Sequence, residues 1–198
     1  MSDQSRTFSR RGLGKSAFVA AAGIIIPGIV AAATEEDALD ETPMALTRRI
    51  SSLSSREWQD YFPSLRNDAV LSIIDDRVLH YWGEDGFYRI YPTSVPLSDE
   101  MTRRGRTEVV FKRPAPEWRP TPSMVERNPD LPRYVGPGPE NPLGIRALNL
   151  SWQYYLIHGT NDIRKIGRQS SSGCIGLFNE HIVEVYDRAK VGTQVLVL

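Results

Sequence analysis

The chain has 198 residues, equal numbers of acidic and basic side chains, and a formal net charge of zero at pH 7. This length supports one domain of roughly 150 residues together with extensions. Hydrophobic residues make up 40% and charged residues 24% of the chain, which is typical of globular proteins and gives no sign of polyanion binding. Nucleic acid is therefore not an expected partner.

Residues 1–33 differ in composition from the remainder of the chain. The pair Arg10 and Arg11 precedes a nearly uncharged stretch, residues 17–33, that is rich in alanine and closes with three alanines. This pattern resembles a bacterial twin-arginine export signal with a cleavage site after Ala33. A buried helix or a membrane anchor is the alternative, which the shortness of the stretch and its glycines and proline disfavour. We expect a protein of the periplasm or cell envelope that keeps no membrane span after signal cleavage.

Residues 34–67 begin with clustered acidic side chains and predict a flexible polar leader. Trp58, Tyr61 and Phe62 indicate that the end of this leader docks on the domain that follows. Residues 68–198 carry short β-type runs separated by turns and form the expected folded domain. The predicted strands are residues 70–74, 78–82, 87–91, 107–111, 147–150, 154–157 and 195–198.

One helix is predicted near the C-terminus, over residues 180–190. Its apolar side chains recur at helical spacing, Asn179 is a candidate N-cap, and Gly192 is a candidate stop. Many short strands with this one helix predict a mainly β fold with a small helical element.

Residues 114–142 contain nine prolines, which remove backbone donors and exclude regular elements in this prediction. A disordered linker is one interpretation. The interleaved Trp118, Met124 and Tyr134 argue against it, because disordered linkers are poor in such residues. An ordered loop over a cleft is the preferred hypothesis, with Trp118 either lining a groove for glycan or peptide or packing in the core.

Cys174 is the only cysteine, and it lies in the stretch SSGCIGL. A lone cysteine in an exported protein cannot form an intramolecular disulfide, so it is either buried as a small apolar side chain or functional. A nucleophilic thiol needs a nearby base. Of the three histidines, His158 is the candidate base, because it ends an apolar strand beside a glycine, whereas His80 and His181 have structural or surface interpretations.

These motifs occur in an order that resembles the catalytic signature of the L,D-transpeptidase (YkuD-domain) family. The resemblance extends over about residues 68–198, and this range is therefore the expected catalytic domain. The segments that carry it are WRPTPSM (118–124), NPLGIRAL (141–148), IHGTN (157–161), IG (166–167) and SSGCI (171–175).

The resemblance implies a β-sandwich or barrel-like domain that acts on peptidoglycan stem peptides without a metal or organic cofactor. Cys174 is implied to attack the carbonyl of the third stem residue, usually meso-diaminopimelate, and to release D-alanine. His158 is implied to move the proton, with the Gly159 carbonyl orienting its imidazole. Backbone N–H groups around Gly173 and Cys174, next to Ser172, are implied to form the oxyanion hole. An amine of a second stem peptide then resolves the thioester into a crosslink.

Two positions depart from the family pattern. Family members often carry His at the position of Ser172 and usually carry Arg at the position of Gly176, where a guanidinium can hold a substrate carboxylate. Loss of such a contact costs ~2 kcal/mol or more. Arg164, Lys165 and Arg168 are candidates to replace it, although a solvated surface cluster is the favoured interpretation of these three residues.

Three functions follow from these observations. The leading hypothesis is a transpeptidase that forms L,D-crosslinks. The second is a variant acyltransferase or L,D-carboxypeptidase whose donor choice is altered at Gly176. The third is a non-catalytic peptidoglycan-binding protein, which the presence of both Cys174 and His158 disfavours.

Overall fold

The structure is a computed structural model that describes residues 54–198. The expected export signal and its cleavage site lie outside this range. The strands are β1 (Ala69–Ile73), β2 (Val78–Trp82), β3 (Tyr88–Pro92), β4 (Val95–Pro96), β5 (Gly105–Arg113), β6 (Ala147–Leu150), β7 (Leu156–His158), β8 (Gln169–Ser171), β9 (Ile175–Gly176) and β10 (Gln194–Val197). The helices are α2 (Pro122–Arg127), α3 (Asn179–Arg188) and the short 3-10 turns η2 (Trp58–Asp60), η3 (Asp99–Met101) and η4 (Ile163–Lys165).

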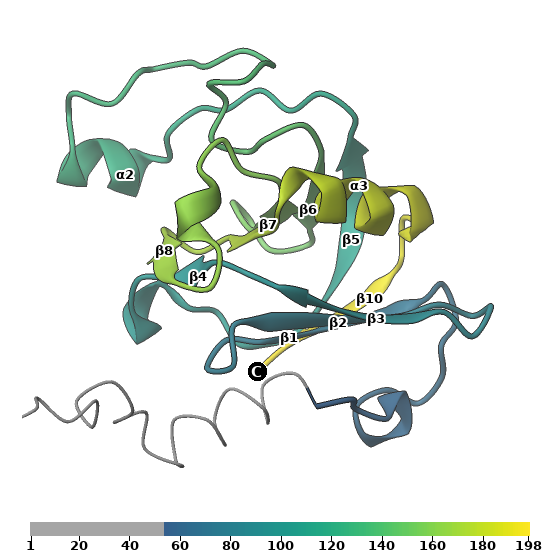
Figure 1. Cartoon of the computed structure of the whole chain (residues 1–198). Coiled ribbons are helices and arrows are strands. Elements are labelled where there is room, and N and C mark those ends of the chain that lie inside the picture. The colour runs from purple at the N-terminus through teal and green to yellow at the C-terminus, as the bar shows by residue number, and fades with distance from the viewer. Residues whose placement is uncertain (1–53) are drawn as a thin grey trace, which may run out of the picture. The chain divides into compact units, whose positions relative to one another are not determined.

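Eight strands form one curled sheet in the order β3-β2-β1-β10-β5-β6-β7-β9, and β4 pairs with β8 separately. β5 belongs to both halves of this sheet: residues 105–108 pair with β10 and residues 109–113 with β6, and the register shifts between Val109 and Phe111. Such an irregularity bends a strand and increases its twist. The β1–β3 wall and the β6–β7 wall therefore belong to one sheet (Figure 1), and the predicted mainly β class is confirmed.

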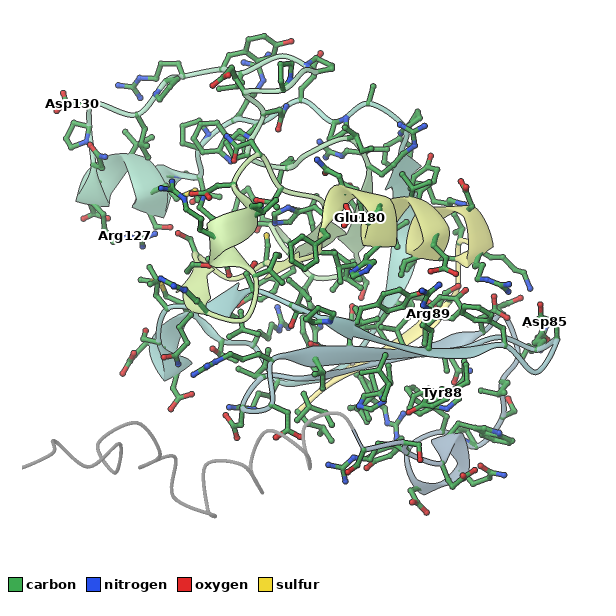
Figure 2. The ribbon with its side chains drawn as sticks, in the orientation of Figure 1. Asp85, Tyr88, Arg89, Arg127, Asp130 and Glu180 are labelled. Atoms are coloured by element: carbon green, nitrogen blue, oxygen red, sulfur yellow. The ribbon has the colours of Figure 1, made fainter. Side chains whose placement is uncertain are left out.

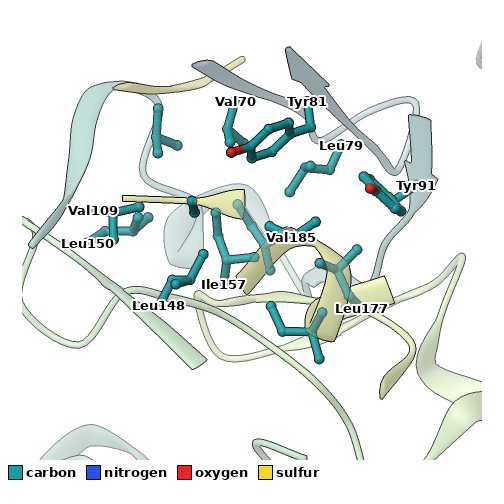
Figure 3. Packing of buried hydrophobic residues seen from close by; sticks show 14 of the residues in the cluster. Val70, Leu79, Tyr81, Tyr91, Val109, Leu148, Leu150, Ile157, Leu177 and Val185 are labelled. Carbon is teal, nitrogen blue, oxygen red and sulfur yellow. The ribbon is translucent and has the colours of Figure 1, made fainter. Parts of the chain in front are cut away.

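The main core lies inside this curl and is closed by α3. Ile182 and Val185, one turn apart on α3, are fully buried, and Figure 3 shows Val185 among side chains from both walls, including Leu79 and Ile157. Burial of a large aliphatic side chain contributes about 1.5–3 kcal/mol, so the packing of α3 holds the two walls in fixed relation. β7 and β9, which carry the candidate site, belong to this rigid unit.

A second cluster covers the outer face of β1 and β2. Phe62 is 3% exposed and packs with Leu71 and Trp82, so the predicted docking of the end of the leader is confirmed. His80 is fully buried here, with its ring stacked on Trp82 and its Nδ1 2.9 Å from the hydroxyl of Tyr88. The structural interpretation of His80 is therefore the right one.

Three local predictions were wrong. The proline-rich segment does contain a helix, α2, because Pro122 stands in its first turn, where proline is tolerated, and Thr121 caps it. The strand expected from residue 154 begins later, at Leu156, since Tyr154 has a φ of 66° and leaves the extended region. Asn179 opens α3 as its first residue, and its side chain forms no cap.

Among residues 54–198, none of the helices has the length and apolar character needed to cross a bilayer. The finding agrees with the short lengths of α2 and α3.

Candidate active site

The register of two parallel strands brings Cys174 and His158 to one face of the sheet. Ile157 pairs with Ile175, and His158 pairs with Gly176. Both isoleucines point into the core, with exposed fractions of 0% and 3%. Because successive side chains along a strand point to opposite faces, His158 and Cys174 point away from the core. Both line the same cleft.

The loop before β9 presents Cys174 in a turn that its own side chains stabilise. The Ser171 hydroxyl donates to the Cys174 carbonyl at 2.6 Å, and the Gly173 N–H donates to the Ser171 oxygen at 3.3 Å. Gly173 has a φ of 134°, which favours glycine. Within residues 54–198 the Cys174 N–H has no hydrogen-bond acceptor, so it is free to meet a ligand oxygen.

The imidazole of His158 is oriented by the backbone of the residue that follows it. Its Nδ1 lies 2.5 Å from the Gly159 carbonyl oxygen, so this nitrogen carries the proton and donates, and Nε2 is left as the acceptor. A Cβ at position 159 would lie 2.2 Å from the Asn179 Oδ1. Only glycine therefore allows the approach that fixes the chain after His158.

Asn179 holds that segment, and the sequence interpretation missed this role. Its Oδ1 accepts from the Thr160 N–H at 3.2 Å and the Ile145 N–H at 3.4 Å, and its Nδ2 donates to the Thr160 carbonyl at 2.9 Å. The signal in the sequence was an Asn at the start of a helix, which has the same appearance as an N-cap.

Burial makes the neutral forms of both groups the stable ones. Burial lowers the pKa of His158 to about 4, with a smaller contribution from the positive charge of Lys165. Burial also raises the pKa of Cys174 to about 11. The thiol donates to the Tyr154 carbonyl at 3.4 Å, and among the described residues no hydrogen bond joins it to His158. The direction of both pKa shifts favours the uncharged forms, a thiol at Cys174 and a neutral imidazole at His158.

The cleft has a volume of about 1050 Å³, and much of its rim comes from the proline-rich segment. Trp118 and Val135 pair through both backbone N–H groups at 2.9 Å, which orders this segment across its length. Trp118, Ser172 and Cys174 line the cleft, as does Met124 of α2. The expected ordered loop over a cleft is confirmed, and Trp118 is placed at the groove and not in the core.

Gly176 lies next to Ser94 and His158, which line the cleft, in a position where a side chain has little room. It is buried, and its backbone exchanges two hydrogen bonds with Ser94, of 2.8 and 3.1 Å. A Cβ there would lie 2.3 Å from the Ser94 Oγ and 3.8 Å from the His158 Cε1. Ser94, which the sequence interpretation did not single out, occupies the space that a larger residue at 176 would need.

The three cationic side chains expected to substitute for an arginine at 176 have different surroundings. Arg164 is paired with Asp162 at 2.8 Å and its side chain is 83% exposed. Arg168 is also exposed. Lys165 lines the cleft. Among residues 54–198, no group of three or more His, Cys, Asp or Glu side chains is placed to hold a metal ion.

Comparison with known proteins adds to this geometry. A family model described as the L,D-transpeptidase catalytic domain, YkuD, matches residues 67–197. One similar protein, from Fuscovulum blasticum, is named as an L,D-transpeptidase in the ATP synthase subunits region, ORF 5. The chain is 46% identical to it over 193 residues, and the match covers 97% of this chain and 98% of that protein.

More distant proteins share parts of this similarity. The chain is 33% identical over 140 residues to ErfK/SrfK of Escherichia coli K12, which is also named as an L,D-transpeptidase, and the match covers 68% of this chain and 45% of that protein. The chain thus spans about half the length of that relative. The crystal structure of an L,D-transpeptidase from Stackebrandtia nassauensis superposes with a TM-score of 0.54 at 14% identity, covering 76% of this chain and 64% of that one. This likeness shows the fold.

Proposed function

The chain belongs to the L,D-transpeptidase (YkuD) family, and we propose that it is a cysteine acyltransferase that crosslinks peptidoglycan stem peptides. The observation that carries the proposal is the placement of the single thiol and an oriented imidazole on one face of the sheet, in a cleft large enough for a peptide.

In the acylation step, Cys174 attacks the carbonyl carbon of the third stem residue. His158 accepts the thiol proton at Nε2, the nitrogen left free by the bond from Nδ1 to Gly159. A sulfur–carbon bond forms, the amide carbon–nitrogen bond breaks, and the proton passes to the nitrogen of the departing D-alanine. The Cys174 N–H, which has no acceptor among the described residues, is positioned to donate to the oxyanion, a contact typically worth ~3 kcal/mol.

In the second step, the amine of another stem peptide attacks the thioester. His158 takes a proton from this amine, the new amide bond forms, the carbon–sulfur bond breaks, and the proton passes from His158 to the sulfur to return the thiol. Water in place of the amine would give a shortened peptide and no crosslink. For each turnover the thiol must give up its hydrogen bond to the Tyr154 carbonyl before it can donate to the Nε2 of His158.

The experiment compares the protein with Cys174→Ala and His158→Gln on purified muropeptides, with products resolved by mass spectrometry. We expect crosslinked dimers from the wild type and none from either variant. His181→Gln is the matched control, since His181 contacts the rings of Tyr91 and Phe178 and does not line the cleft. Shortened monomers alone would indicate a carboxypeptidase, and product formation that survives Cys174→Ala would refute the cysteine mechanism.

We further propose export by the twin-arginine route, on the basis of the pair Arg10 and Arg11 and the apolar stretch after it. The substrate requires this placement, because peptidoglycan lies outside the cytoplasmic membrane. Replacement of both arginines by lysine is expected to leave the protein uncleaved in the cytoplasm, as fractionation and mass measurement of the N-terminus would show. Cleaved protein in the envelope would contradict the proposed route.

A further inference from the structure

Among residues 54–198, four cationic side chains line the cleft, and they differ in what holds them. Arg113 donates from Nε to Asn149 at 2.7 Å. Arg119 lies over the ring of Tyr134 at 4.5 Å. These two are engaged by the protein itself, and Lys165, which lies near His158, offers a single point charge.

Arg127 is the fourth, and its guanidinium is available to a ligand. It is the last residue of α2 and lies between that helix and the segment after β8 (Figure 2). Its Nη2 donates to the Ser172 Oγ at 3.2 Å. It forms no ion pair with any described residue, and it is exposed to the cleft. A neutral hydroxyl is a weak partner for a guanidinium, so a carboxylate would displace it.

The position of Arg127 relative to the thiol suits a peptide that ends soon after the attacked carbonyl. Ser172 is two residues before Cys174, and two residues span at most about 7 Å. In a donor tetrapeptide, the terminal carboxylate lies one residue beyond the attacked carbonyl, about 3.5 Å further along the chain. The carboxylate and Ser172, which the guanidinium contacts, thus both lie within about two residue lengths of Cys174.

We propose that Arg127 is the specificity-determining residue that binds the terminal carboxylate of the donor peptide, and that Ser172 holds the guanidinium in place while the cleft is empty. The inference rests on the proposed function for the identity of the donor. A guanidinium can reach the cleft from α2, whereas Ser94 fills the space beside Gly176 from which a β9 side chain would extend. The contact restricts acylation to donors with one residue beyond the attacked carbonyl.

The test measures binding of two synthetic stem tetrapeptides, one with a free terminal carboxylate and one with a terminal carboxamide, to the Cys174→Ala protein by calorimetry. A lost charge-assisted contact corresponds to about a 10- to 100-fold weaker association. We expect this preference for the free acid in Cys174→Ala, its loss when Arg127→Gln is added, and its retention when Arg133→Gln is added. Arg133 is the matched control because it is exposed on the same segment and does not line the cleft.

Equal binding of the acid and the amide to Cys174→Ala, or a preference that persists after Arg127→Gln, would overturn the role of Arg127. These outcomes are independent of catalysis, because the binding variants lack the thiol. Loss of the preference in the Arg133→Gln protein as well would also overturn it, since a general charge effect would then explain the result. The proposed function fails separately, if the wild type forms no Cys174-dependent acyl-enzyme with the free-acid tetrapeptide.

Discussion

Gly176 and Ser94 are coupled by steric contact, and a double-mutant cycle can measure the coupling. In Gly176→Ala the new Cβ would lie 2.3 Å from the Ser94 Oγ, more than 1 Å inside the ~3.5 Å at which non-bonded atoms attract. Relief of such a contact in a packed region costs about 1–3 kcal/mol. In a Ser94→Ala background the nearest remaining contacts are the Cβ of residue 94 at 3.6 Å and the His158 Cε1 at 3.8 Å, which are ordinary distances.

Urea unfolding followed by tryptophan fluorescence gives the free energy of unfolding for each protein in the cycle. We expect Gly176→Ala to lose about 1–3 kcal/mol in the wild-type background and less than ~0.5 kcal/mol in the Ser94→Ala background. Gly136→Ala is the control, because its Cβ would meet nothing closer than the Tyr134 hydroxyl at 3.5 Å. The same loss in both backgrounds would refute the reasoning, as would no loss in the wild type.

Three other properties can be checked directly. Because burial raises the pKa of Cys174 to about 11, alkylation by iodoacetamide should accelerate about tenfold per unit between pH 7 and pH 10, and a plateau at neutral pH would instead indicate a thiolate–imidazolium pair. Asn179→Ala removes three hydrogen bonds to the backbone and should lower the free energy of unfolding by ~2–3 kcal/mol. The control, Asn161→Ala, should be nearly neutral, because the exposed Asn161 side chain donates one bond. Equal losses in the two variants would contradict the positioning role of Asn179. Burial lowers the pKa of His80 to about 4 from 6.5, so between these pH values the unfolded chain binds more protons than the native one. The free energy of unfolding should therefore fall by ~3 kcal/mol as the pH drops from 6.5 towards 4. His80→Phe should flatten this pH dependence in urea titrations, leaving the share due to His158, and an unchanged slope would count against the assignment.

Local patterns in the sequence were sufficient for most of the regular elements. The alternation and turn signals predicted β1, β2, β3, β5, β6 and β10 to within about two residues, because these strands are long enough for an apolar pattern to repeat. β4, β8 and β9 contain two or three residues each, which is too short for any periodicity. They exist because neighbouring strands supply their hydrogen bonds.

The candidate thiol and base could also be found from the sequence, since one cysteine and few histidines leave little choice once a motif orders them. The sequence could not show that the two side chains lie on the same face of one sheet. This placement depends on the parallel pairing of β7 with β9, a contact between segments separated by the loop that contains η4. The role of Asn179 was hidden for the same reason, because its partners at Ile145 and Thr160 are distant along the chain.

Gly176 and Arg127 show most clearly what the sequence determines and what only the tertiary structure determines. The sequence alone shows that residue 176 is Gly, at a position where the resemblance to the family leads us to expect Arg. That Ser94 fills the space next to Gly176, and that a guanidinium from α2 reaches Ser172 at 3.2 Å, depend on long-range packing. Steric exclusion and charge complementarity act through space between residues that are far apart in the chain. These contacts can therefore be identified only in the folded structure.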